Sequence, residues 1–367
     1  MKRKIRVGIL FGGKSAEHEV SLQSAKNIVE AIDRNKYEVV LIGIDKKGRW
    51  QLNRDSKFLL NEKNPKLIKL NRASDNLALI PGKEERQLVS LSDLRSSEPV
   101  DVVFPVLHGP FGEDGTVQGL LKLANVPFVG AGVLGSAVGM DKDVMKRLLR
   151  DAGIPTAKIL VFERSEKDKI DFIDVKRQLG FPFFVKPANL GSSVGIHKIK
   201  DRKLFNSAVE DAFRYDHKIL LEEYIQGREI ECSVLGNENP IASLPGEIIP
   251  QHEFYSYEAK YIDENGAIFV VPAKLPKEII ATIQNLALRT FKTLCCEGMA
   301  RVDFFLRNEK EVIVNELNTI PGFTKISMFP KMWEASGISY TELIDRLIQL
   351  ALERFEREKH LKTSFDL

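Results

Sequence analysis

The sequence contains little cysteine, almost no excess charge and no long apolar run. Its three cysteines are Cys232, Cys295 and Cys296; two are adjacent, and none forms the C-x-x-C spacing of a metal site. Adjacent cysteines rarely bond to each other, so we expect reduced thiols and a cytoplasmic protein. Lys and Arg number 54 against 51 Asp and Glu, a balance that predicts no nucleic-acid partner.

The chain also lacks any segment near the roughly 20 apolar residues that a membrane-spanning helix needs. Its start is basic and then apolar, but the apolar run at 5–10 is too short for a signal peptide and leads into two glycines rather than a cleavage site. We therefore expect a buried strand here and no membrane partner. With 367 residues, 43% of them hydrophobic, the chain is long enough for two or three domains.

The periodicity of the apolar residues predicts an α/β fold. Up to a boundary near residue 140 we predict a helix at 20–32 and strands at 5–10, 37–44, 100–107 and 127–129. The polar stretch 46–98 has few apolar runs and is interpreted as an irregular insertion or a small hairpin region. Beyond the boundary we predict helices at 144–152 and 340–358, and strands at 183–186, 195–199, 218–224, 229–235, 300–306 and 311–317.

Two of these apolar strands carry polar residues, as R301-V-D303 and E316-L-N318. Residues two apart on a strand share a face, and a buried carboxylate needs a partner or a cation. The oxygens of Asp303, Glu316 and Asn318 suit Mg²⁺, while a structural salt bridge between Arg301 and Glu316 is the alternative. The glycine-containing turn at 319–327 favours the metal, because its backbone N–H groups could contact a reacting anion.

A second candidate site is the glycine- and serine-rich loop that follows Lys186. Residues 187–195 hold two glycines and two serines, which permit close backbone approach and add donors for phosphate oxygens. The lysine precedes the glycines and no helix follows directly, so this is not a P-loop. A hairpin turn without a ligand is the alternative interpretation.

Three further segments contain candidate residues. Glu17 follows a glycine pair and opens a helix, where it could complement the helix dipole or hold a substrate ammonium; G-x-G-x-x-G is absent, so NAD is not expected. His108 opens a glycine-rich turn and could be structural or functional. The long segment 245–272 could be a lid or a surface loop.

Seven motifs occur in order along the chain: G12-G-K-S-A-E-H-E-V-S21, H108-G-P-F-G-E-D-G-T-V-Q-G119, M140-D-K142, V185-K-P187 with G191-S-S-V-G195, E258-A-K-Y261, R301-V-D303 and N315-E-L-N-T-I-P-G322. Together they resemble the D-alanine–D-alanine ligases of the ATP-grasp superfamily. The resemblance implies a Rossmann-like α/β domain at 1–140, with 46–98 as its insertion, followed by a two-part ATP-grasp fold of α+β type. The two ATP-grasp parts would be 141–225 and 226–367, with a lid at about 245–272.

The resemblance also implies roles for individual residues. Those expected to bind D-alanine are Glu17, His108, Arg301 and Ser327. Arg301 and the N–H of Gly322 would form an oxyanion hole, and Ser192 and Tyr261 would join Glu17 in a network that closes the lid. Residues expected to bind ATP are Lys142, Lys186, Ser193, Glu222, Glu223, Ile225, Glu229 and Lys260. Asp303, Glu316 and Asn318 would bind two Mg²⁺ or Mn²⁺ ions.

The activity that the resemblance implies is ATP-dependent joining of two D-alanine molecules through a D-alanyl phosphate, for peptidoglycan synthesis, by a homodimer. D-Lactate or D-serine as second substrate is the close alternative, and Tyr261 argues against lactate. More distant alternatives are an ATP-grasp ligase for an unrelated acid and a nucleotide-binding regulatory module. The module predicts a missing metal ligand or phosphate lysine, and none is missing. Two positions depart from common family members: Leu190 replaces an acidic residue and His18 an arginine.

Overall fold

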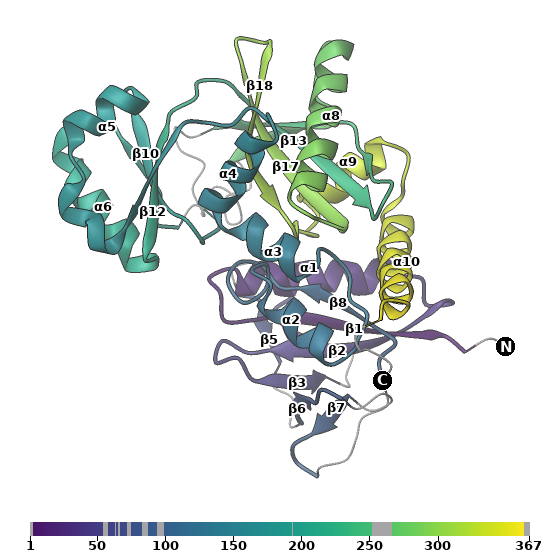
Figure 1. The fold of residues 1–367 in the computed structure, drawn as a ribbon. Helices are drawn as coiled ribbons and strands as arrows, with labels where there is room; N and C mark the ends of the chain where they lie inside the picture. Colours follow the sequence, from purple (N-terminus) through teal and green to yellow (C-terminus); the bar gives the residue numbers. More distant parts are fainter. Residues whose placement is uncertain are drawn as a thin grey trace.

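The computed structural model describes residues 3–53, 58–62, 64, 67–71, 75–82, 87–93, 99–192, 194–251 and 266–362. These residues form three large sheets, and each sheet belongs to one lobe of the molecule (Figure 1). The central sheet lies on the left in Figure 1, the C-terminal sheet at the upper right and the N-terminal sheet below. This mixture of parallel and antiparallel sheets with helices confirms the predicted α/β and α+β character.

The N-terminal sheet has the strand order β7-β6-β3-β2-β1-β8. Its parallel part consists of β1 (Ile5–Gly12), β2 (Tyr37–Ile44) and β8 (Val102–Val106). The described parts of 46–98 extend this sheet with antiparallel strands or form a separate pair; these elements are β3 (Trp50–Asn53), β6 (Asn76–Leu79), β7 (Leu88–Ser90), and the pair β4 (Leu59–Leu60) and β5 (Lys69–Leu70).

Helices cover both faces of this sheet, as the continuous burial of β1 requires. The apolar side chains of α1 (His18–Ala31) share one core with β1, and those of α2 (Thr116–Leu123) share another on the opposite face. The functional loops follow β1 and β8, so they leave the carboxyl ends of neighbouring parallel strands, where ligands bind in open α/β sheets.

The central sheet is antiparallel, in the order β11-β10-β12-β9. Its elements are β9 (Ile159–Glu163), β10 (Phe183–Pro187), β11 (His197–Ile199) and β12 (Lys218–Glu223), with the 3₁₀ turns η1 (Arg164–Lys169) and η2 (Arg202–Leu204) and the helices α5 (Phe172–Leu179) and α6 (Phe205–Tyr215). Both helices pack on one face through a separate apolar core. The other face of the central sheet is directed toward the C-terminal lobe.

The C-terminal sheet is also antiparallel, in the order β16-β15-β13-β17-β18, with β14 beside β13. Its strands are β13 (Arg228–Gly236), β14 (Ile241–Ala242), β15 (Gly246–Pro250), β16 (Ala267–Val270), β17 (Gly298–Arg307) and β18 (Glu311–Asn318). The helices around it are α3 (Val133–Met140), α4 (Lys142–Asp151), α8 (Lys277–Thr293) and α9 (Met328–Ala335). Met145 and Leu149 of α4 belong to the apolar core of this sheet.

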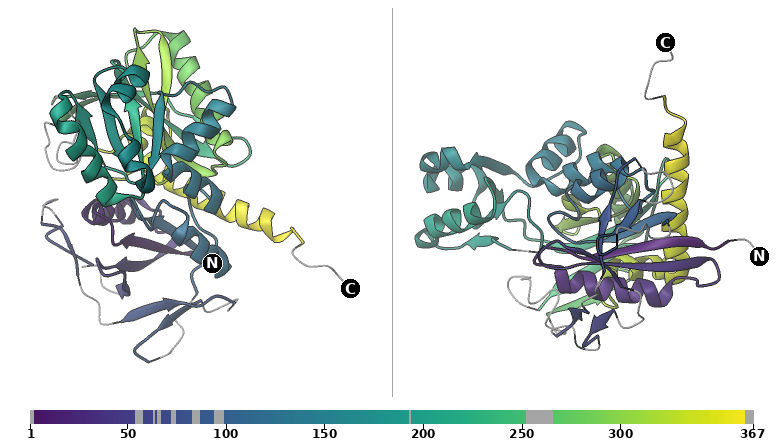
Figure 2. Two further views of the ribbon diagram at one scale, coloured as in Figure 1. Left: turned by 60° about the vertical axis from the view of Figure 1, so that its left-hand side comes forward. Right: turned by 90° about the horizontal axis from the view of Figure 1, so that it is seen from below.

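The last helix, α10 (Tyr340–Lys359), joins the C-terminal lobe to the N-terminal one, and Figure 2 shows it running beside the N-terminal sheet. Its predicted apolar face is confirmed for Leu343, Ile344 and Leu347, which are fully buried in the core shared with α1. The buried Arg354 on the same face donates hydrogen bonds to the carbonyls of Gly130 and Phe128. No helix in the described part of the chain is long and apolar enough to cross a membrane.

Candidate active site

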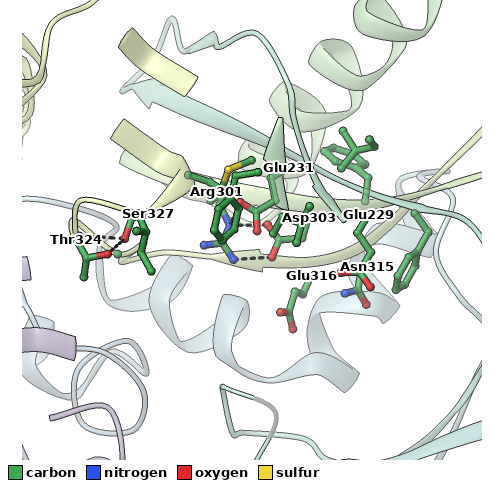
Figure 3. Close-up of a pocket in the computed structure, with 16 residues that line it drawn as sticks. Glu229, Glu231, Arg301, Asp303, Asn315, Glu316, Thr324 and Ser327 are labelled. Carbon is green, nitrogen blue, oxygen red and sulfur yellow. Dashed lines mark hydrogen bonds and ion pairs between the residues drawn. The ribbon is translucent and has the colours of Figure 1, made fainter. Parts of the chain in front are cut away.

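One cavity lies between the central and C-terminal sheets, and a second lies within the C-terminal lobe beside it. The larger, of about 460 Å³, is lined by Lys142, Lys186, Gly191, Ser192, Glu222, Tyr224, Ile225 and other residues of both sheets. The smaller, of about 140 Å³, is lined by Arg301, Asp303, Gly322, Thr324, Ser327 and their neighbours (Figure 3). Residues that line both are Glu229, Ile248, Phe305, Asn315 and Glu316. The two cavities are therefore neighbours that share lining residues of β13, β15, β17 and β18, among them Asn315 and Glu316.

Strands β17 and β18 lie side by side, and the strand period predicted a shared face for Arg301 with Asp303 and for Glu316 with Asn318. The register places Arg301 opposite Asn318 and Asp303 opposite Glu316. The Arg301 guanidinium donates two hydrogen bonds of 2.7 Å to Asp303 and lies 3.1 Å from Glu231 (Figure 3). Arg301 is thus held in place between two carboxylates.

Three side chains on this face carry hard oxygen atoms, the donor type that a divalent cation prefers. Asp303 and Glu316 contribute carboxylates, and Asn318 contributes an amide oxygen that also accepts the N–H of Ile320 at 3.1 Å. The Glu316 side chain is 34% exposed and lines both cavities. Within the described ranges, no three His, Cys, Asp or Glu residues gather as a metal site, so the donor set is two carboxylates and an amide. Such a set leaves coordination positions for phosphate oxygens.

Three lysines surround the wall of the larger cavity. Lys186 Nζ donates to Glu222 Oε1 at 2.6 Å, and Lys146 Nζ lies 2.9 Å from Glu222 Oε2. Lys142 Nζ donates to the carbonyl of Leu190 at 2.8 Å and lies 3.8 Å from Glu316. Burial lowers the pKa of Lys142 and of Lys146. Burial acts to raise the pKa of Glu222, but Lys146 and Lys186 outweigh it and hold that pKa below its usual value.

The sequence interpretation missed Lys146. The available signal was its position four residues after Lys142, which places both lysines on one face of α4.

Among the predicted nucleotide residues, Ile225 and Glu229 line the larger cavity. Glu223 instead accepts the backbone N–H of Lys158 at 2.8 Å, toward β9. Ser193, Lys260 and Tyr261 lie outside the described residues.

A second group of residues joins the loops after β1, β8 and β18. Ser192 of the central lobe donates a hydrogen bond to the buried Glu17 at the start of α1. His108 is buried; its Nδ1 lies 2.9 Å from the carbonyl of Ile320, and its Nε2 lies 3.3 Å from the Ser24 hydroxyl. Burial is the main cause that lowers the pKa of His108, so the ring is neutral at pH 7.

Glu113, which the sequence interpretation also missed, lies buried beside this group. The oxygens of its carboxyl group accept the N–H of Gly109 at 2.6 Å and that of Ile320 at 3.3 Å, so it ties the loop after β8 to the loop after β18. Burial, followed by the charge of Glu17, raises the pKa of Glu113 to about 8. Its place in the H108–G119 motif was the only signal available.

Ser327 and Gly322 lie at the end of the smaller cavity. The Ser327 hydroxyl accepts the N–H of Thr324 at 3.0 Å and lies 2.8 Å from the Thr324 hydroxyl. A methyl group added at Gly322 would come within 2.7 Å of the Ser327 hydroxyl, so only glycine leaves this approach open. The structure therefore places Arg301, Gly322 and Ser327 around one cavity.

Known proteins match this architecture over almost the whole chain. The family descriptions "D-ala D-ala ligase N-terminus" and "D-ala D-ala ligase C-terminus" match residues 6–131 and 148–349. The D-alanine–D-alanine ligase of Oceanobacillus iheyensis is 58% identical over 364 residues, 99% of each chain. The solved D-alanine-D-alanine ligase of Coxiella burnetii is 40% identical with a TM-score of 0.83, covering 97% of this chain and 96% of its own. The solved VanG D-Ala:D-Ser ligase of Enterococcus faecalis is 34% identical with a TM-score of 0.83, covering 95% and 100%.

The structure has α/β architecture, and a lysine-lined cavity with acidic oxygens at its end lies between two antiparallel sheets. This is the architecture of an ATP-grasp ligase. Such an enzyme uses ATP and a divalent metal ion. The chain belongs to the D-alanine–D-alanine ligase family.

Proposed function

We propose that this enzyme joins two D-alanine molecules to D-alanyl-D-alanine, at the expense of ATP and for peptidoglycan synthesis. The observation that carries the proposal is the meeting of the two cavities at Asn315 and Glu316. The larger cavity has the lysines for a triphosphate, and the smaller has the arginine and hydroxyl for an amino acid. A carboxylate in the smaller cavity could thus meet the terminal phosphate at their junction.

A free carboxylate is a poor acyl donor, so the first D-alanine must be activated by phosphoryl transfer. Lys142 and Lys186 would hold the phosphates, and Glu17 would bind the ammonium of this D-alanine with His108 nearby. Positioning and charge neutralisation supply most of the catalysis in such a transfer. The product is D-alanyl phosphate.

The amine of the second D-alanine then attacks the carbonyl carbon of this acyl phosphate, and phosphate leaves. The oxyanion formed during the attack needs donors, which Arg301 and the N–H of Gly322 would supply. Ser327 would bind the carboxylate of the second D-alanine. Its hydroxyl already lies against Thr324, so its direction is set before substrate arrives.

We propose Asp303, Glu316 and Asn318 as ligands of two Mg²⁺ or Mn²⁺ ions. When bound, these ions neutralise the charge of the phosphates during transfer. The donor set supports this assignment, because hard oxygen ligands that leave room for phosphate suit Mg²⁺. The metal assignment requires no cysteine or histidine ligand.

Ile225, Glu229 and the backbone near Glu222 and Glu223 would surround the nucleoside, while Ser193, Lys260 and Tyr261 keep the roles that the resemblance implies. The proposed domains are 1–140, 141–225 and 226–367; each contains one of the three sheets, while α4 of the second domain packs against the C-terminal sheet. A cytoplasmic homodimer follows from the family resemblance, and sedimentation of the purified protein tests the dimer.

The decisive test is product identification with purified enzyme, ATP and Mg²⁺. ADP release should depend on D-alanine and not on L-alanine, and the product should be D-alanyl-D-alanine. D-Alanine labelled with ¹⁸O in its carboxyl group should transfer one label to the released phosphate, because the acyl phosphate bond is broken at carbon. D-Serine and D-lactate, supplied in competition, test the alternative second substrates. The proposal is contradicted if the main product contains D-serine or D-lactate, or if the released phosphate carries no label.

A further inference from the structure

Lys146 is a buried charge with no direct access to the active site. It lies on α4, one turn after Lys142, and its side chain is 0% exposed. Its Nζ lies 2.9 Å from Glu222 and donates to the carbonyl of Asn315 at 3.0 Å. Glu222, Asn315 and Lys142 line the larger cavity, whereas Lys146 stands behind this lining. It therefore reaches the nucleotide only through its neighbours.

Glu222 creates an electrostatic problem for a phosphate site. Its carboxylate lies 2.6 Å from Lys186 Nζ, and both side chains are less than a tenth exposed. A buried pair of opposite charges is neutral, so Glu222 alone would cancel the charge that Lys186 presents to an anion. A second cation on the other carboxylate oxygen changes this balance. With Lys146 present, two ammonium groups face one carboxylate, and the trio has one positive charge left over.

We propose that Lys146 is a positioning residue that offsets the negative charge of Glu222. The positive charge of Lys186 then remains available to attract the phosphates of ATP. This inference rests on the proposed function, in which Lys186 binds phosphate. The hydrogen bond from Lys146 to Asn315 adds a geometric role, because it fixes the α4 lysines against the strand that carries Glu316. Burial favours the neutral amine of Lys146, while Glu222 favours its charged form.

The experiment measures binding of ADP and of adenosine at fixed Mg²⁺ by calorimetry. The ratio of the ADP affinity to the adenosine affinity isolates the contribution of the phosphates. Measuring it requires no ligase activity. In Lys146→Met the trio becomes neutral, and the ratio should fall about 10- to 100-fold, the value of one hydrogen bond to a charged group. Adenosine affinity should stay within about threefold of wild type, on the scale of one weak neutral contact.

Two further variants separate charge from packing. Lys146→Met combined with Glu222→Gln restores one net positive charge, so the ratio should return toward wild type. Glu222→Gln alone leaves two positive charges, so its ratio should equal or exceed that of wild type, even if the Lys146 single variant does not fold. Met145→Ala is the matched control, because it disturbs the same buried helix without removing a charge; it should leave the ratio unchanged.

Equal losses of ADP and adenosine affinity in Lys146→Met would show that Lys146 acts by packing alone. A folded double variant with a ratio as low as the single variant would also overturn the proposal, as would a lowered ratio in Glu222→Gln. A failure of the proposed ligase activity appears separately, as the absence of D-alanyl-D-alanine in the product assay.

Discussion

The hydroxyl of Ser192 donates a hydrogen bond to the carboxylate of Glu17, across 175 positions of sequence. Ser192 belongs to the loop between β10 and β11 in the central lobe, and Glu17 opens α1 in the N-terminal lobe. The contact therefore joins the lobe that would hold the phosphates to the residue that would hold the ammonium of the first D-alanine. A substrate bound at Glu17 is thereby linked to the loop over the nucleotide.

The first prediction concerns this contact. Ser192 has a left-handed backbone, with φ at 53°, so glycine can replace it without strain. Ser192→Gly removes the hydrogen bond to a charged group, which is worth about 1.5–3 kcal/mol, or about 10- to 100-fold in an equilibrium. We expect KM for the first D-alanine to rise within that range while ADP affinity changes little. Steady-state kinetics at saturating ATP measure the KM.

Ser192→Ala is the informative companion, because it also removes the hydroxyl but keeps a side chain in the left-handed region. Its KM for the first D-alanine should rise at least as much as that of the glycine variant. An unchanged KM in both variants would show that the hydrogen bond does not assist substrate binding.

The second prediction concerns Glu316, at the junction of the two cavities. Glu316→Gln keeps the size of the side chain and removes one charge from the proposed metal site. We expect turnover to fall at least about 100-fold at saturating Mg²⁺, on the scale of losing one strong electrostatic contact. The matched control is Glu311→Gln on the same strand, where an exposed carboxylate pairs with Arg307. Near-normal turnover in folded Glu316→Gln would remove Glu316 from the metal site.

The third prediction concerns Gly322. An alanine methyl here would come within 2.7 Å of the Ser327 hydroxyl, closer than real contacts permit. Gly322→Ala should displace Ser327 and raise KM for the second D-alanine by about tenfold or more, as expected for loss of one hydrogen bond to a carboxylate. Gly119→Ala in α2, where the added methyl meets nothing within 4 Å, is the control and should keep wild-type kinetics. Equal KM values for both variants would contradict the assigned role of Ser327.

The fourth prediction uses the pH dependence of stability. The pKa of Glu113 is raised to about 8, mainly by burial and then by the charge of Glu17. The folded protein therefore keeps a proton that the unfolded chain releases above its ordinary value near 4.5. A raised pKa makes stability greatest at low pH and reduces it as pH rises through this interval, by at most about 1.4 kcal/mol per pH unit for one proton.

Glu113→Gln mimics the protonated acid and removes this titration. Between pH 5 and 8, we expect the melting temperature of the variant to rise relative to that of wild type, even if a lost hydrogen bond lowers it at pH 5. Differential scanning calorimetry at several pH values measures the difference. A difference that stays constant across this interval would show that Glu113 is ionised in the folded protein.

Local pattern alone predicted much of this protein. The period of two along β17 and β18 was enough to place Arg301 with Asp303 and Glu316 with Asn318 on shared faces, and the register then brought the two pairs together. The 3- and 4-residue spacing of 340–358 predicted the buried face of α10 because helical geometry repeats on that scale. Ordered motifs made the family recognisable without any contact being known.

Only the tertiary structure decided which distant groups meet. Lys146 and Glu222 are brought together by the packing of α4 against two separate sheets, and no local periodicity records that arrangement. The contact between Ser192 and Glu17 was expected from the family resemblance alone, and the structure contains it. Burial likewise depends on the final packing, so the high pKa of Glu113 was invisible in its motif. The sequence determined the elements and their chemistry, because these follow from neighbours along the chain. The tertiary structure determined the charge balance of the site, because electrostatic energy depends on distance and desolvation in space.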